Sequence, residues 1–110
     1  MDFAVQEIDA DRAVVATNGR LNMVSAPAFR ETLSSVVANG RSRVVVDLAG
    51  VEFMDSSGLG ALVGCLKTAR QAGGDLRIAR PSEQVQMVLR LSNIDRILRP
   101  YPTVEAAQEF

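Results

Sequence analysis

The sequence predicts a small α/β domain built on a mixed sheet of four to five strands, with helices packed against the sheet. Its first two apolar runs, Phe3 to Ile8 and Ala13 to Thr17, are separated only by Asp9-Ala10-Asp11. A turn this short joins antiparallel strands. After them, helical and strand periodicities alternate to the end of the chain, which is typical of an α/β domain. We expect residues 1–110 to form one domain, because no linker or repeat divides them.

Further strands are expected downstream of the first two. Arg43 to Leu48 is dense in β-branched residues and apolar on both faces apart from Asp47, as in a central strand covered by helices. Leu76 to Ala79 follows the second helix, and Ile97-Leu98 is the candidate for a short edge strand. Asn18-Gly19 is expected to end the second strand, because both residues favour turns.

Apolar residues at helical spacing predict three helices, and a short fourth helix follows near the C-terminus. Each has a residue type that commonly starts or stops a helix at its ends. The expected helices are a first one capped by Ser25 and stopped by Asn39-Gly40, a second from about Ser57 to Ala72, a third opened by Pro81-Ser82 and closed near Ser92-Asn93, and a last one from Thr103 to about Glu109.

The composition excludes several classes of function. Histidine is missing, so no Ser-His-Asp triad or Cys-His pair can form, and zinc could be held only by carboxylates and Cys65. The formal net charge of −1 offers no basic field for nucleic acid or an anionic membrane. The N-terminus lacks a signal-peptide pattern, and no apolar run approaches the roughly 20 residues of a transmembrane helix. We expect a cytoplasmic protein that contacts neither nucleic acid nor membrane directly, with Cys65 in the core.

Catalysis is not expected. Gly58 and Gly60 lie at a strand-to-helix turn, but they form no Walker A pattern and no lysine follows at the required place. The Asp and Glu residues show no spacing typical of a metal site or an acid/base pair. The sequence therefore predicts no enzyme activity, no cofactor and no metal.

The stretch Asp55-Ser56-Ser57-Gly58-Leu59-Gly60 lies where a buried strand has ended and the second helix begins. Asp55 and Ser56 suit a capping role, because their oxygens can accept hydrogen bonds from the unpaired N–H groups of the first turn. Ser57 places a hydroxyl at the positive end of the helix dipole. A phosphate there would add about −1.5 to −2 charges to an otherwise neutral surface, so Ser57 is a candidate switch.

One face of the second helix carries only small side chains and lies opposite a Leu/Val stripe. Glycine inside a helix costs about 1 kcal/mol relative to alanine, so its presence suggests that something approaches closely. Either a neighbouring helix of the same domain packs on this face, or a partner protein docks there. The residues of the face are Ser57, Gly60, Ala61, Gly64 and Thr68.

Several segments carry a family resemblance. Val44-Val45-Val46-Asp47-Leu48, followed by Val51 to Gly60, closely resembles the signature of bacterial anti-sigma factor antagonists, which are STAS domains. Gly19 to Asn22, Ala26-Pro27-Ala28-Phe29 and Leu89 to Asp95 resemble further parts of the family in the same order. The similarity thus covers nearly the whole chain.

The resemblance implies a regulator that binds a cognate anti-sigma factor, a serine kinase using ATP and Mg²⁺, and so frees a sigma factor. The kinase phosphorylates the second serine of the motif, which is Ser57 here, and the complex then separates until a phosphatase restores the serine. Asn22 stands where the family commonly has aspartate. The lost charge either indicates a different cognate kinase or only exchanges one capping residue for an equivalent one. The expected partner-binding residues are Arg20, Asn22, Asp55, Ser56, Ser57, Gly58, Gly60, Ala61, Gly64 and Thr68.

A second hypothesis is a STAS domain that is never phosphorylated. It would be an adaptor subunit of a signalling or transport complex. The complete serine pair favours the phosphorylated regulator. In either case we expect a monomer or a weak dimer.

Overall fold

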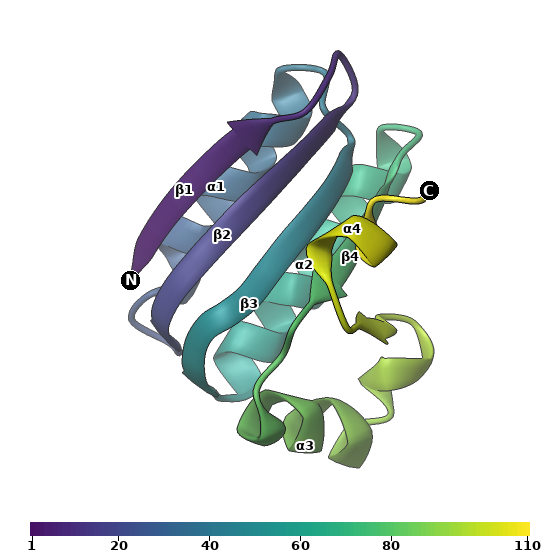
Figure 1. Cartoon of the computed structure of the whole chain (residues 1–110). Coiled ribbons are helices and arrows are strands. Elements are labelled where there is room, and N and C mark those ends of the chain that lie inside the picture. Colours follow the sequence, from purple (N-terminus) through teal and green to yellow (C-terminus); the bar gives the residue numbers. More distant parts are fainter.

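The computed structural model describes all residues, 1–110, and shows five strands in the order β1-β2-β3-β4-β5 (Figure 1). β1 pairs with β2 antiparallel, and the other three pairs of neighbours are parallel. The predicted mixed sheet with an antiparallel first pair is confirmed. The strands are β1 (Asp2–Glu7), β2 (Arg12–Leu21), β3 (Arg43–Met54), β4 (Asp75–Ala79) and β5 (Pro100–Tyr101).

β2 and β3 are both longer than the sequence pattern indicates. The expectation that Asn18-Gly19 ends β2 is wrong, because the strand absorbs these residues in register shifts and continues to Leu21. Gly19 has φ +111, a conformation that glycine adopts without strain. β3 likewise runs past Leu48, the expected end, as far as Met54. The two extensions pair Leu21 with Met54 at the carboxyl ends of both strands.

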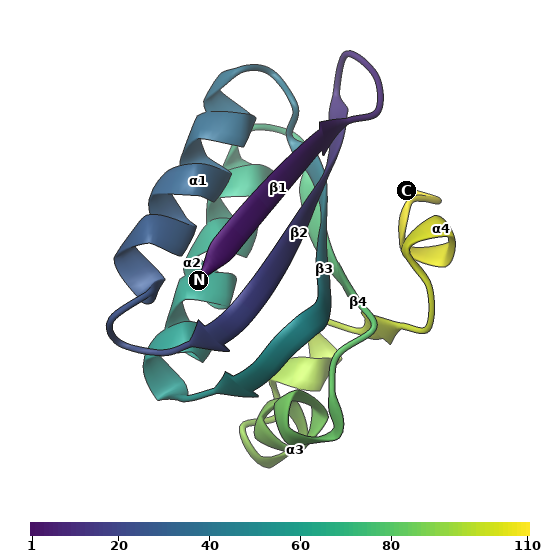
Figure 2. The same ribbon diagram turned by 60° about the vertical axis from the view of Figure 1, so that its left-hand side comes forward.

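Four α-helices surround the sheet. α1 and α2 lie side by side on one face, α4 lies on the opposite face, and α3 lies beyond the carboxyl ends of the central strands (Figure 2). The bounds are α1 (Ala26–Ala38), α2 (Ser56–Gln71), α3 (Glu83–Leu91) and α4 (Val104–Ala107), with a 3-10 turn, η1, at Ile94–Arg96.

The C-terminal part differs from its prediction in two places. Ile97-Leu98 is not a strand: Ile97 ends η1, and Leu98 is a buried core residue. The edge strand is instead Pro100–Tyr101. The last helix is capped by Thr103 as expected, but ends at Ala107 rather than near Glu109.

The core has two unequal parts. The main cluster fills the space between the sheet and the helices of the α1/α2 face, and includes Phe29, Leu33 and Leu62. A small cluster under α4 contains Val14, Val45, Ala79 and Ala107. Burial on both faces explains why β3 is apolar from Val44 to Val46.

Asp47 interrupts the apolar run of β3 and is nearly buried. Its carboxylate accepts two hydrogen bonds from the Arg80 guanidinium and one from the backbone N–H of Ala49. These partners offset the cost of removing the charge from water. Arg80 has φ +55, a positive backbone angle at the end of β4.

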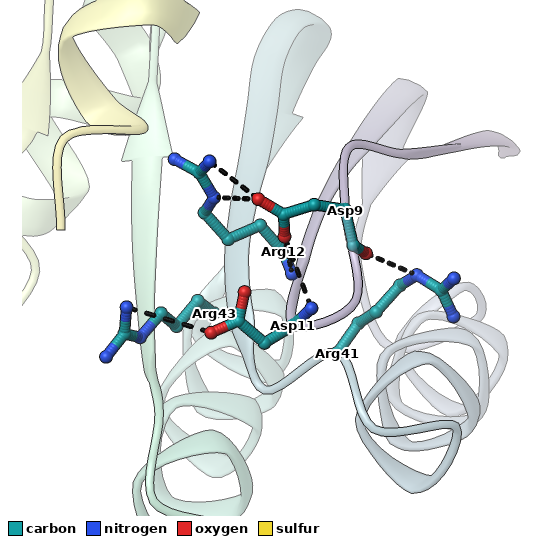
Figure 3. A network of polar contacts seen from close by, with 5 residues as sticks. All are labelled: Asp9, Asp11, Arg12, Arg41 and Arg43. Carbon is teal, nitrogen blue, oxygen red and sulfur yellow. Dashed lines mark hydrogen bonds and ion pairs between the residues drawn. The ribbon is translucent and has the colours of Figure 1, made fainter.

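A charged network surrounds the turn between β1 and β2 (Figure 3). The Asp9 carboxylate pairs with Arg12 at 2.6 Å and accepts the backbone N–H of Arg12 at 2.9 Å. Arg41 donates to the Asp9 carbonyl at 3.2 Å, and Arg43 pairs with Asp11 at 3.7 Å. The hydrogen bond from Arg12 lowers the pKa of Asp9 to about 2. The Asp9 carboxylate thus holds the turn between the two strands through the backbone N–H groups of Asp11 and Arg12.

None of the helices has the length and apolar character needed to cross a membrane.

Candidate functional site

The candidate site lies where β2 and β3 end and α2 begins. Asp55 is the N-cap of α2, and its carboxylate accepts the N–H of Gly58 at 2.9 Å. The Asp55 N–H in turn donates to the Leu21 carbonyl at the end of β2. The predicted capping role of Asp55 is confirmed, and the cap also ties the helix start to the sheet.

Gly58 is required by close packing at this junction. It is buried, and a Cβ placed there would lie 2.2 Å from the Leu21 carbonyl oxygen and 2.8 Å from Leu21 Cγ. Only glycine lets the first turn of α2 approach the end of β2 this closely. The expectation of Gly58 as a partner-binding residue is therefore corrected, because the neighbouring strand occupies the space beside it.

Ser56 and Ser57 follow the cap and present their hydroxyl groups. Ser56 is exposed and Ser57 is half-buried. Neither hydroxyl makes a hydrogen bond within the chain, since the cap is supplied by Asp55 alone. The capping role expected of Ser56 is wrong. Ser57 thus has a hydroxyl with no structural role, at the end of the helix where the dipole favours negative charge.

Asn22 builds the turn that leads from β2 to α1. Its side-chain oxygen accepts the N–H groups of Val24 at 3.0 Å and of Ser25 at 3.2 Å. Ser25 occupies the N-cap position of α1 but does not cap it, because its hydroxyl donates to the Arg20 carbonyl at 2.6 Å. This turn leaves Met23 and Val24 exposed by 72% and 85%.

Ser57 lines a shallow surface depression of about 300 Å³, here named the Ser57 depression. The Arg30 guanidinium lies 3.8 Å from where a Cβ of Gly60 would be, and it forms no ion pair. A hydroxyl, an unpaired cation and exposed apolar atoms therefore share one surface. The lining residues are Met23, Ala26, Pro27, Arg30, Ser56, Ser57 and Gly60.

Part of the small-residue face of α2 packs within the domain, and part of it stays open to a partner. Ala61 is fully buried in the main core, so its expected place on the partner face is wrong. α1 lies beside α2, and Arg30 of α1 approaches Gly60. Gly64 is bordered by open space, because a Cβ added to it would meet no neighbouring atom within 4 Å. The Thr68 hydroxyl donates to the Gly64 carbonyl within the same helix.

Arg20 lies outside the Ser57 depression. Its guanidinium stacks on the Phe53 ring, 4.5 Å from the ring centroid, across the β2–β3 pairing. Met23, Val24, Pro27 and Arg30 were not among the residues predicted for the site. In the sequence, only the adjacent apolar pair Met23-Val24, in a short segment between a strand and a helix, could have indicated an exposed apolar surface here.

The chain matches the STAS domain model over residues 2–107. A Thermotoga maritima protein whose name places it among anti-sigma factor antagonists is 34% identical over 100 residues, covering 90% of this chain and 88% of that protein. The anti-sigma-B factor antagonist of Staphylococcus epidermidis is 32% identical over 84 residues, covering 76% of this chain and 78% of the relative.

Solved structures agree with these sequence matches. An anti-sigma factor antagonist from Mycobacterium paratuberculosis superposes with a TM-score of 0.85 at 28% identity, covering 96% of this chain and 89% of that one. The unphosphorylated form of the anti-sigma factor antagonist SpoIIAA superposes with a TM-score of 0.81 at 22% identity, covering 96% and 92%, and shares the fold.

Proposed function

The chain belongs to the STAS domain family, and we propose that it is an anti-sigma factor antagonist switched by phosphorylation of Ser57. It would bind a cognate anti-sigma factor with serine kinase activity in the cytoplasm, releasing a sigma factor, and would perform no catalysis of its own. The names of its relatives support the class of regulator. The observation that carries the site is the pair of serines at the start of α2, whose hydroxyls line an accessible surface and make no hydrogen bond within the chain. The choice of Ser57 over Ser56 rests on its place as the second serine of the motif.

The partner would dock over the Ser57 depression. Met23 and Val24 offer exposed apolar area beside it, and a stable interface needs such area at its centre. Gly60 is exposed and Gly64 has open space around it, so a partner backbone could approach α2 closely there. Asn22 contributes by shaping the turn that presents Met23 and Val24.

Phosphorylation would separate the complex by changing the charge of this surface. The phosphate would add about −1.5 to −2 charges at the rim of the depression without disturbing the cap, since Asp55 holds the helix start independently. It would also attract the unpaired Arg30 guanidinium, which would then be lost as a contact to the partner. A phosphatase acting on the same serine would restore binding.

The experiment that tests the site is phosphate transfer. Candidate anti-sigma factor kinases from the same genome are incubated with the purified chain, ATP and Mg²⁺, and the phosphorylated residue is mapped by mass spectrometry. Ser57→Ala should abolish transfer and keep binding. Ser56→Ala is the matched control and should keep both, because Ser56 is the adjacent exposed hydroxyl. Phosphate on Ser56, or undiminished transfer to Ser57→Ala, would refute the assignment.

Calorimetry tests the mechanism of release. Ser57→Asp should weaken the complex, whereas Ser57→Asn, similar in size but uncharged, should weaken it much less. Equal affinities of the two variants would show that charge does not drive release. A partner that binds at the Ser57 depression but transfers no phosphate would favour the adaptor hypothesis instead.

A further inference from the structure

A second surface of the molecule combines positive charge with an open sheet edge. It is a depression of about 290 Å³ beside β4, here named the arginine depression. Four of its lining residues are Arg70, Arg77, Arg96 and Arg99, and the only acidic one is Asp75. The formal net charge of the whole chain is −1, so this concentration of arginine is a local feature.

Two of the four arginines have internal partners and two do not. Arg70 pairs with Asp75 at 3.1 Å. Arg77 donates to the carbonyls of Ala107 and Glu109 and stacks on the Tyr101 and Phe110 rings. The exposed guanidinium groups of Arg96 and Arg99 form no ion pair and no hydrogen bond within the chain. They are available to an external anion.

The edge of β4 beside these arginines is only partly covered. β5 pairs with Ile78 and Ala79 alone, so Asp75–Arg77 have no strand partner on that side. The Asp75 carboxylate accepts hydrogen bonds from the backbone N–H of Leu76 at 2.9 Å and from the Arg70 guanidinium. These two donors are therefore occupied, and the guanidinium groups left for an external carboxylate are those of Arg96 and Arg99.

We propose that the arginine depression binds an acidic, extended peptide segment of a partner protein. Carboxylate side chains of the segment would pair with Arg96 and Arg99, and its apolar side chains would contact Ile97, which lies between them and is 45% exposed. A free phosphate would make no use of Ile97. A nucleic acid would need a broader positive field than these four arginines provide, because the net charge of the whole chain is only −1.

This surface is separate from the Ser57 depression. Arg70 is thirteen residues after Ser57 on α2, which places the two ends of the helix about 20 Å apart. The two depressions share no lining residue. The inference does not depend on phosphorylation of Ser57, and a binding test at the arginine depression can succeed or fail independently of the proposed function.

The test uses the full chain, ¹⁵N-labelled, titrated with the acetylated peptide Glu-Val-Glu-Val-Glu-Val and followed by NMR. Chemical-shift changes should concentrate at residues 75–77 and 96–101. Arg96→Gln with Arg99→Gln should weaken the peptide at least about tenfold, since each charge-assisted hydrogen bond is lost. The matched control is Lys67→Gln with Arg90→Gln, which lowers the net charge equally at exposed positions that form no ion pair, and it should change affinity less than about twofold.

Three outcomes would overturn the proposal. The first is an equal loss of affinity in both double variants, which would show a general charge effect. The second is equal binding of the corresponding lysine peptide. The third is a single-stranded oligonucleotide that binds more tightly than the peptide and loses affinity when Arg96 and Arg99 are replaced, which would show a polyanion site. Ser57→Asp should leave peptide affinity unchanged, and a large change would show that the two surfaces are coupled.

Discussion

Gly58 and Gly64 allow one substitution to be compared at two places on the same helix. An alanine Cβ at Gly58 would lie 2.2 Å from the Leu21 carbonyl oxygen, well inside the 3.4 Å at which ordinary contact begins. The obstacle is backbone, so it cannot move aside as a flexible side chain would. At Gly64 a Cβ would meet no neighbouring atom within 4 Å. We therefore expect opposite effects of Gly58→Ala and Gly64→Ala on stability.

The magnitudes follow from two contributions. Replacing glycine by alanine inside a helix stabilises by about 1 kcal/mol, and this is the whole effect expected at Gly64. Overpacking against an unyielding neighbour costs up to about 3 kcal/mol, so the net change at Gly58 is a loss of about 2 kcal/mol. For a domain of this size, at about 5 °C per kcal/mol, the melting temperature should fall by about 10 °C for Gly58→Ala and rise by about 5 °C for Gly64→Ala.

Thermal and urea denaturation of the two variants check this prediction. Gly58→Ala with wild-type stability would refute the conclusion that close packing on Leu21 sets the start of α2. The stabilised variant Gly64→Ala has a second use, because an added methyl group on an intact fold tests the docking surface. If a partner approaches α2 closely at Gly64, this variant should bind it more weakly despite its higher melting temperature.

Two further predictions concern titratable groups. Burial raises the pKa of the Cys65 thiol to about 11, so the thiol should react with a disulfide reagent at pH 8 only as fast as the domain unfolds; rapid labelling of the folded protein would contradict its place in the core. The hydrogen bond from Arg12 lowers the pKa of Asp9 from 3.8 to about 2. Its stabilising contribution is therefore complete above about pH 4 and is lost as the pH falls toward 2. Asp9→Asn should lose less stability than wild type over that range in acid denaturation, and an unchanged pH dependence would show that the pairing adds nothing to the fold.

Several features of this protein follow from the sequence alone, because they depend on neighbouring residues. Asp55 caps α2 since a carboxylate three residues before a free N–H reaches it without help from the rest of the fold. The apolar character of Val44, Val45 and Val46 likewise indicates a strand covered on both faces, which the structure shows. The position of Ser57 at a helix start follows from the same local pattern.

Other features were decided by tertiary packing. Helical periodicity places Ala61 among small residues, but which side of α2 is buried depends on how α1 and the sheet meet it, and they bury Ala61. β2 continues past Gly19 because β3 offers a partner as far as Met54. Arg30 joins Ser57 from a different helix, and Arg96 and Arg99 join Arg70 from a distant segment. Local sequence encodes hydrogen bonds within a turn and the apolar period of an element, whereas the rotation of each helix and the meeting of distant residues are set by the packing of the whole domain.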